Sequence, residues 1–165
     1  MKKALVTYYS DTGNTEKLAR TLYEAIPIAK ELKPVKDAES ADRYDIILCG
    51  FPVQAHSVPE KVQPFIKGLA KGQKIAFFST HGSLRGGQLP KQAFEHAIGL
   101  APTANILGHF GCRGSVDQKI IDALMQKPEH KAWAEEAQSA AGHPDQGDLE
   151  DARKFALEMI AKIGS

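Results

Sequence analysis

The sequence has few cysteines and no long apolar run, and each shortage excludes a class of protein. Its two cysteines, Cys49 and Cys112, form no Cys-x-x-Cys pair and have no cluster of metal-ligating residues beside them. We therefore expect two small buried thiols in a reducing compartment, with neither a disulfide framework nor a metal site. No apolar run approaches the roughly 20 residues that span a bilayer. The first residues lead into a strand pattern and not into a signal-peptide core, so we expect a cytoplasmic protein that does not bind membranes.

The sequence also lacks a strong net charge and the common nucleotide-binding motifs. Its 21 basic and 20 acidic residues give a net charge of +1, without a dense cluster of lysine and arginine. Nucleic acid is therefore not an expected partner. Neither Gly-x-Gly-x-x-Gly nor Gly-Lys-Ser/Thr occurs. With 165 residues, 42% of them hydrophobic, the chain can bury a sizeable core, and we expect one monomeric domain over residues 1–165.

Apolar runs and helical patterns alternate along the chain. Strands are expected at 3–9, 28–35, 44–50, 74–79 and 105–111, and helices at 15–26, 59–69, 89–98, 117–125, 133–140 and 149–163. Three charged residues, Lys30, Glu31 and Lys33, place the second strand at the edge of the sheet. Because short connections between parallel strands require right-handed crossovers, the pattern predicts a doubly wound α/β sheet. An extra helical segment is expected around 127–147.

The loop Ser10-Asp11-Thr12-Gly13-Asn14-Thr15 follows the first strand and precedes the first helix. Gly13 allows a close backbone turn, the amides point at the start of a helix, and three hydroxyl groups surround them. These features indicate a phosphate-binding turn. The alternative is an ordinary strand-to-helix turn, in which Ser10 or Thr12 only caps the helix.

This loop matches the pattern Ser/Thr-x-Thr-Gly-x-Thr, and the chain resembles the flavodoxin family over roughly residues 1–125 and again at the last helix. The resemblance implies a flavodoxin-like doubly wound five-stranded parallel sheet of order 2-1-3-4-5, with helices on both faces. It also implies FMN as the cofactor, with its phosphate in this loop and its ring between two further loops. The implied cofactor contacts are Ser10, Asp11, Thr12, Gly13, Asn14 and Thr15 for the phosphate, Pro52, Val53, Gln54, Ala55, His56 and Ser57 on one side of the ring, and Thr80, His81, Gly82, Ser83, Leu84 and Gly87 on the other.

Three departures from the family pattern bear on function. Flavodoxins commonly stack Tyr or Trp on the flavin, whereas these loops offer only Phe51, His56 and His81. General electron carriers of the family are strongly acidic, and the near-neutral charge here favours one dedicated partner. The longer stretch before the last helix contains the only tryptophan, Trp133, which we expect to pack an extra helix onto the sheet.

The ring loops contain cationic residues and no acidic ones. The ranges 51–59 and 79–94 contain neither Asp nor Glu, and they include His56, His81, Arg85 and Lys91. A cation about 5 Å from an anionic reduced flavin would stabilise it by ~1 kcal/mol in water and ~3 kcal/mol at an effective dielectric of about 20. We therefore expect a less extreme second reduction step than in a standard flavodoxin. If His56 or His81 faces the ring, the potential should also vary with pH between about 5 and 8.

The resemblance implies an FMN-binding electron-transfer protein that carries electrons between a reductase and an acceptor redox enzyme. The flavin would supply the chemistry, so no catalytic side chain and no metal are expected. The alternative is an FMN-dependent NAD(P)H:quinone or small-molecule reductase, with a histidine as proton donor. A third alternative is a flavin-free phosphate-binding module. The strand ends lack the acidic cluster of a receiver domain, and no arginine follows either cysteine at the phosphatase spacing.

Overall fold

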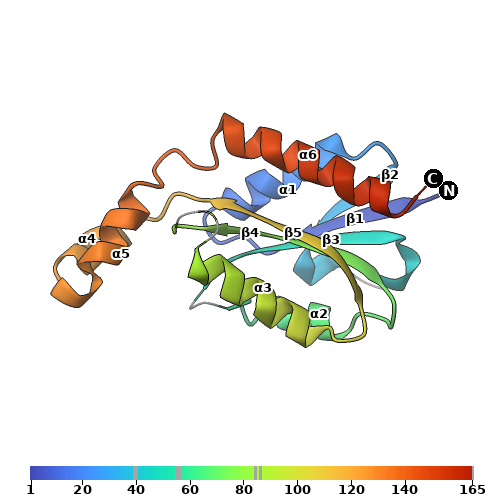
Figure 1. The fold of residues 1–165 in the computed structure, drawn as a ribbon, viewed down its shortest axis with the longest axis horizontal. Helices are drawn as coiled ribbons and strands as arrows, with labels where there is room; N and C mark the ends of the chain where they lie inside the picture. Colours follow the sequence, from blue (N-terminus) through green and yellow to red (C-terminus); the bar gives the residue numbers. More distant parts are fainter. Residues whose placement is uncertain (39–40, 55–56, 84, 86, 165) are drawn as a thin grey trace.

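A parallel sheet of five strands forms the centre of the molecule (Figure 1). The computed structural model describes the chain except for residues 39–40, 55–56, 84, 86 and 165. The strands are β1 (Lys3–Tyr8), β2 (Ala29–Pro34), β3 (Ile46–Pro52), β4 (Lys74–His81) and β5 (Asn105–Arg113). Their spatial order is β2-β1-β3-β4-β5, and all neighbouring pairs are parallel. The expected fold class and the edge position of the second strand are thereby confirmed.

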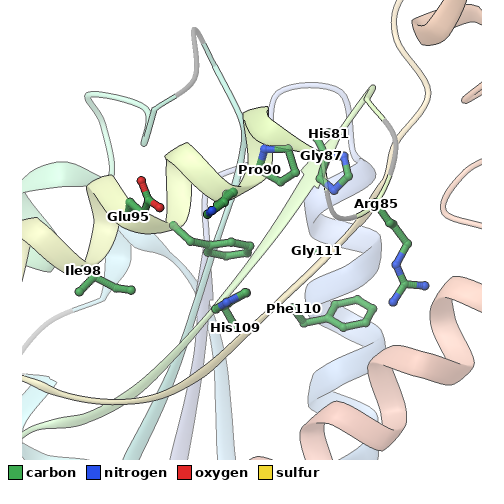
Figure 2. Close-up of a pocket in the computed structure, with 11 residues that line it drawn as sticks. His81, Arg85, Gly87, Pro90, Glu95, Ile98, His109, Phe110 and Gly111 are labelled. Atoms are coloured by element: carbon green, nitrogen blue, oxygen red, sulfur yellow. The ribbon is translucent and has the colours of Figure 1, made fainter.

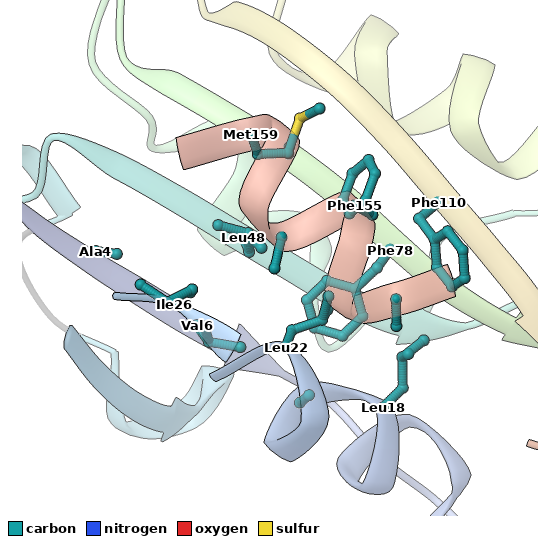
Figure 3. Close-up of a cluster of buried hydrophobic side chains, with 14 of the residues drawn as sticks. Ala4, Val6, Leu18, Leu22, Ile26, Leu48, Phe78, Phe110, Phe155 and Met159 are labelled. Atoms are coloured by element: carbon teal, nitrogen blue, oxygen red, sulfur yellow. The ribbon is translucent and has the colours of Figure 1, made fainter. Parts of the chain in front are cut away.

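Helices cover both faces of this sheet. Helices α1 (Asn14–Ala25) and α6 (Gln146–Lys162) lie on one face, and α2 (Gln63–Lys67) and α3 (Gln88–Leu100) lie on the other (Figure 1). Successive strand residues point to opposite faces, so Val6 belongs to the cluster under α1 and α6 and Leu5 to the cluster under α2 and α3. The first cluster brings Leu22 of α1 and Phe155 of α6 onto Phe78 of β4 (Figure 3).

Helix α2 is much shorter than the helix expected over 59–69. It begins at Gln63, and Pro64 occupies one of its first two positions. Proline has no N–H to donate and its ring clashes with the preceding turn, so a helix can begin at Pro64 but cannot continue through it. The residues before it form a turn instead, in which the N–H of Val62 donates to the carbonyl of Pro59 at 2.9 Å.

A helical hairpin lies beyond the carboxyl ends of the strands (Figure 1). It consists of α4 (Gln118–Met125), the 3₁₀ turn η3 (Pro128–His130) and α5 (Lys131–Gln138). Two further 3₁₀ turns, η1 (Val35–Asp37) and η2 (Ala41–Arg43), precede β3. The hairpin has its own small apolar cluster, against which Trp133 packs. Trp133 therefore joins α5 to α4, and the expectation that it packs a helix onto the sheet is wrong.

None of the described helices combines the length and the apolar composition needed to cross a membrane. The two thiols are fully buried, Cys112 under α1 and α6 and Cys49 on the opposite face. Burial raises the pKa of Cys49 to about 12, and burial together with the carboxylate of Asp148 raises that of Cys112 to about 12. Both therefore remain protonated at neutral pH, as the structural interpretation of these cysteines requires.

Candidate functional site

The loops that follow β1, β3, β4 and β5 enclose a cavity of about 180 Å³ at the carboxyl edge of the sheet. The chain winds in opposite directions from β1 and β3, so this cavity lies at the topological switch point, where doubly wound sheets bind ligands. Its lining residues are Asp11, Thr12, Asn14, Pro52, Val53, Gln54, Thr80, His81, Gly82, Gly114, Ser115, Val116, Asp117 and Ile120. We call it the loop cavity.

The loop after β1 is held open by a left-handed glycine. Gly13 stands at the N-cap of α1 with φ of 96°, a conformation that side-chain-bearing residues rarely adopt. The hydroxyl oxygen of Ser10 accepts the N–H groups of Gly13 at 3.1 Å and Glu16 at 3.2 Å. Ser10 therefore does part of the work of a helix cap, as the ordinary-turn alternative predicts, and its own O–H remains available to donate.

The same loop presents unused donors to the loop cavity. Among the described residues, the N–H groups of Thr12 and Asn14 have no hydrogen-bond partner. The hydroxyl oxygen of Thr12 accepts from the side-chain amide of Asn14 at 3.3 Å, which leaves the Thr12 O–H free to donate. Free amides and hydroxyls at the start of a twelve-residue helix suit a phosphate dianion. The donor set of this loop therefore fits a phosphate monoester.

The remaining loop residues hold neighbouring segments in place. Thr15 is 1% exposed, and its hydroxyl lies 2.8 Å from that of Thr80, so it joins α1 to β4. The side chain of Asn14 donates to the carbonyl of Ser115 at 2.8 Å. Ser10, Gly13 and Thr15 thus shape the loop without lining the cavity.

Asp11 connects the first loop to the loop after β3. Its two carboxylate oxygens accept from the Tyr9 hydroxyl at 2.9 Å and from the Gln54 side-chain amide at 2.8 Å. The hydrogen bond to this carboxylate raises the pKa of Tyr9 above its usual value. Because Asp11 is anionic and already bonded on both oxygens, we assign it to positioning Gln54 and not to anion binding.

The expected ring loops contribute to the cavity only in part. Pro52, Val53 and Gln54 line it on one side and Thr80, His81 and Gly82 on the other, whereas Ser57, Ser83 and Gly87 do not. Ala55, His56 and Leu84 are outside the described residues. Phe51 is fully buried, with its ring 6.5 Å from that of Phe94. It therefore cannot stack on a ligand in the cavity.

Of the four expected cationic residues, Arg85 and Lys91 do not line the loop cavity, and His56 is outside the described residues. Arg85 pairs with Asp151 at 2.8 Å and approaches Asp148 at 3.9 Å, which offsets its charge. Lys91 lines a separate cleft along β5. His81 is 5% exposed, and burial, assisted by the nearby Arg113 and Arg85 guanidinium groups, lowers its pKa below the usual value of 6.5. His81 is therefore neutral at pH 7, and the effect of the ring-loop cations on the reduction potential stays a prediction.

Sequence reasoning missed the segment after β5. Gly114, Ser115, Val116 and Asp117 line the loop cavity together with Ile120 from the first turns of α4. The N–H of Gly114 donates to the carbonyl of His81 at 2.8 Å. The available signal was the position of this segment, because carboxyl ends of parallel strands share one edge of the sheet.

Arg113, also missed, binds the loop after β4 to the helical hairpin. Its guanidinium donates to the carbonyls of Gly82 at 3.1 Å and Ser83 at 3.2 Å. It also donates to the carbonyl of Glu136 at 2.8 Å and to the carbonyl and hydroxyl of Ser139 at 3.3 and 2.7 Å. Carbonyl groups at the end of α5 and on the ring loop are thus satisfied by one side chain.

A group of metal-capable side chains stands before α6. One ligand atom each of His143, Asp145 and Asp148 lies within 4.8 Å of the others. Asp145 and Asp148 form a capping box: each carboxylate accepts the other residue's backbone N–H at 2.9 Å, and Asp148 also contacts His143 at 2.6 Å. These bonds account for the cluster as the start of α6, where acidic residues are favoured.

Comparison with known proteins identifies the family. A sequence model of the flavodoxin domain matches residues 5–157. The flavodoxin-like domain-containing protein BilS of Clostridioides difficile is 28% identical over 172 residues, which cover 97% of each chain. A short-chain flavodoxin associated with a bacterial microcompartment aligns over 99% of this chain and 100% of its own, with a TM-score of 0.70 and 14% identity. A flavoprotein from Lactobacillus acidophilus, solved in complex with FMN, aligns over 74% of this chain and 98% of its own, with a TM-score of 0.56 and 22% identity. The chain belongs to the flavodoxin family.

Proposed function

We propose that this protein binds FMN in the loop cavity and carries electrons between a reductase and an acceptor enzyme. The observation that carries the proposal is the convergence of four loops on one cavity at the switch point, with a phosphate-type donor set on the first. Membership in a family of flavoproteins supports the same cofactor.

The residues divide into two groups by the part of FMN that they would hold. The N–H groups of Thr12 and Asn14 and the hydroxyl of Thr12, two residues that line the loop cavity, would bind the phosphate. The segments 52–54 and 80–82, which line the loop cavity, would hold the ring, and the N–H of Val53 ties one to the other by donating to the carbonyl of Thr80 at 2.9 Å. When bound, FMN supplies one- and two-electron redox chemistry. The protein would orient it and exclude water from it.

The charges around the loop cavity favour a strongly negative second reduction step. Asp11 and Asp117 line the cavity, whereas the Arg85 charge is offset by α6 carboxylates. A carboxylate about 5 Å from an added negative charge opposes it by ~1 kcal/mol in water and ~3 kcal/mol at an effective dielectric of about 20. We therefore infer a potential in the direction of an ordinary flavodoxin, opposite to the expectation from the sequence.

A second candidate function is an FMN-dependent NAD(P)H:quinone or small-molecule reductase. The observation that favours it is the additional wall that Val116 and Ile120 give to the loop cavity, because the ring loops alone are short. Steady-state oxidation of NADH or NADPH by the FMN-loaded protein separates the two functions. The electron-carrier proposal predicts slow oxidation with and without a quinone, whereas rapid turnover with a quinone identifies a reductase.

The cofactor assignment is tested by adding FMN to the purified protein, removing free FMN by desalting and recording the visible spectrum. We expect oxidised-flavin bands at about one FMN per chain, together with quenched or shifted flavin fluorescence. A colourless protein after desalting would exclude both redox functions. It would leave the flavin-free phosphate-binding module as the remaining interpretation of the first loop.

A further inference from the structure

A second, larger cleft runs along the edge strand β5. It has a volume of about 530 Å³ and lies between α3 and the outer residues of β5 (Figure 2). In Figure 2 it extends along α3 from Ile98 at one end to Gly87 at the other, with His109 and Gly111 below the helix. Small-molecule sites in proteins usually have volumes of roughly 300 to 1,000 Å³. We call it the edge cleft.

The edge cleft contains a buried hydrogen-bond acceptor without a partner. His81 lines it, and its Nδ1 lies 2.9 Å from the carbonyl oxygen of Ser83. A carbonyl can only accept, so Nδ1 carries the hydrogen and Nε2 has a free lone pair. His81 is 5% exposed, and its Nε2 has no hydrogen-bond partner among the described residues. A buried acceptor is destabilising while it is unsatisfied.

Residue 111, at the floor of the edge cleft, is a glycine, so no side chain separates the cleft from this buried acceptor. A Cβ on Gly111 would lie 3.2 Å from Nε2 of His81 and 3.3 Å from the hydroxyl oxygen of Ser79. That Ser79 hydroxyl is also fully buried and unpartnered among the described residues. Two unsatisfied polar atoms therefore border one small space at Gly111, which itself lines the cleft.

The walls of the edge cleft combine apolar rings with the charged residues Arg85, Lys91 and Glu95. The ring of Phe94 lies over the imidazole of His109, with centroids 4.2 Å apart and planes at 31°. Pro90 and the half-exposed Ile98 extend this surface along α3. The guanidinium of Arg85 lies 5.2 Å from the centre of the Phe110 ring at the other end. A flat apolar body with one polar end would match these walls and the floor.

We propose that the edge cleft binds a flat, mostly apolar small molecule that carries one O–H or N–H donor. The donor enters the space at Gly111 and hydrogen-bonds to Nε2 of His81, with the Ser79 hydroxyl beside it. The apolar body lies against Phe94, Pro90 and His109. The walls of this site come from α3, β5 and the segment after β4 and not from the loop after β1, and His81 is shared with the loop cavity.

The test compares p-cresol with toluene, which lacks its hydroxyl. Each probe is added to the isotope-labelled protein as purified, and the backbone amide shifts are followed by NMR. We expect both to shift residues of the edge cleft and p-cresol to bind about fivefold more tightly, which corresponds to one hydrogen bond. Equal affinities would overturn the proposal, because a bound water alone then satisfies His81. Shifts outside the edge cleft, or no shifts, would also overturn it.

Two variants locate the hydrogen bond. Gly111→Ala covers Nε2 and should lower p-cresol affinity about fivefold, to that of toluene. The matched control is Gly99→Ala on α3, where an added Cβ meets nothing within 4 Å, and it should retain the preference. His81→Leu should remove the preference as well, by deleting the acceptor. If Gly111→Ala, confirmed as folded by its amide spectrum, keeps the p-cresol preference, the donor does not bind at this position.

Discussion

The loop cavity and the edge cleft share His81, yet different kinds of atoms line them. The loop cavity presents hydroxyls, free N–H groups and carboxylates from exposed loops, with Asp11 and Thr12 at its surface. The edge cleft presents the rings of Phe94 and His109, with one buried acceptor at its floor. The first is suited to an anionic group and the second to an apolar body with a single donor.

The two sites also depend on different levels of structure. The loop cavity depends on local backbone geometry, since Gly13 at φ of 96° sets the direction of the neighbouring N–H groups. The edge cleft depends on strand register, because the pairing of Ser79 with Gly111 puts a residue without a side chain beside Nε2 of His81. A shift of one residue would put Phe110 or Cys112 at that position and reverse the faces. Substitutions can therefore disable one site and spare the other.

The largest expected effect is the loss of FMN binding in Gly13→Val. Valine at this left-handed position is strained by about 1–2 kcal/mol, and the loop relieves the strain by turning its N–H groups away. Losing two charge-assisted hydrogen bonds of about 1.5 kcal/mol each lowers FMN affinity by about 100-fold. Flavin-fluorescence titration measures this loss, and p-cresol binding in the edge cleft should not change.

The matched control for that variant is Gly72→Val. Gly72 has φ of 79° and, like Gly13, no atom within 4 Å of an added Cβ, but it lies in the turn before β4. The Gly72→Val variant should lose the same free energy of unfolding, about 1–2 kcal/mol, and keep its FMN affinity. Equal losses of affinity in the two variants would mean that Gly13 acts through stability alone.

Arg113→Met should disturb both sites at once. The Ser83 carbonyl accepts from Arg113 at 3.2 Å and lies 2.9 Å from the Nδ1 of His81, so one residue supports the ring loop and the acceptor of the edge cleft. Removing the guanidinium leaves several carbonyls unpaired, and we expect about 2 kcal/mol lower stability in urea unfolding. Arg113→Lys can restore part of these bonds and should lie between wild type and Arg113→Met. A Met variant as stable as wild type would contradict this account.

Ile120→Ser tests the wall that α4 adds to the loop cavity. Ile120 is 51% exposed, so only part of its apolar surface would be covered by a bound flavin. We expect about a threefold loss of FMN affinity, from roughly 25 Å² of apolar contact at about 25 cal/mol per Å². Leu157→Ser on α6 is the control, since Leu157 is equally exposed, at 51%, and far from the cavity in the sequence and the fold. A loss of affinity in both variants would contradict a specific contact.

The smallest expected effect is a pH dependence of stability from His81. Burial lowers its pKa in the folded state, so the unfolded chain binds more protons below the ordinary value of about 6.5. The stability is complete above that pH and falls as the solution becomes more acidic. Urea unfolding of His81→Leu between pH 7 and 5 should show a flatter profile than wild type. Identical slopes would mean that His81 is protonated equally in both states.

Local patterns predicted most of the fold. The buried runs around Leu5, Ile47 and Phe77 became strands within a few residues of their expected bounds, because their apolar content demands a position between two helical layers. The short α2 was missed because helical spacing of Phe65 and Ile66 outweighed the break at Pro64. The missing N–H and the ring of Pro64 set where this helix begins, and apolar spacing contains no information about either.

The candidate site likewise has parts that local sequence patterns predict and parts that they do not. The loop Ser10–Thr15 is contiguous, so its donors could be predicted as a group. The contact between Asn14 and Ser115 joins residues 101 positions apart, and no local pattern indicates it. The ion pair of Arg85 with Asp151 joins residues 66 positions apart, and no local pattern shows that it offsets the Arg85 charge. Pairings of this kind arise only when the sheet register and the helix positions are set.

The most direct test of the account is an NMR titration of the labelled protein with FMN. If the loop cavity is the flavin site, the amides of Thr12, Asn14, Gly82 and Ser115 shift and saturate at about one FMN per chain, while those of Ile98 and His109 in the edge cleft do not move. Shifts confined to the edge cleft, or the absence of saturable shifts, would contradict the assignment.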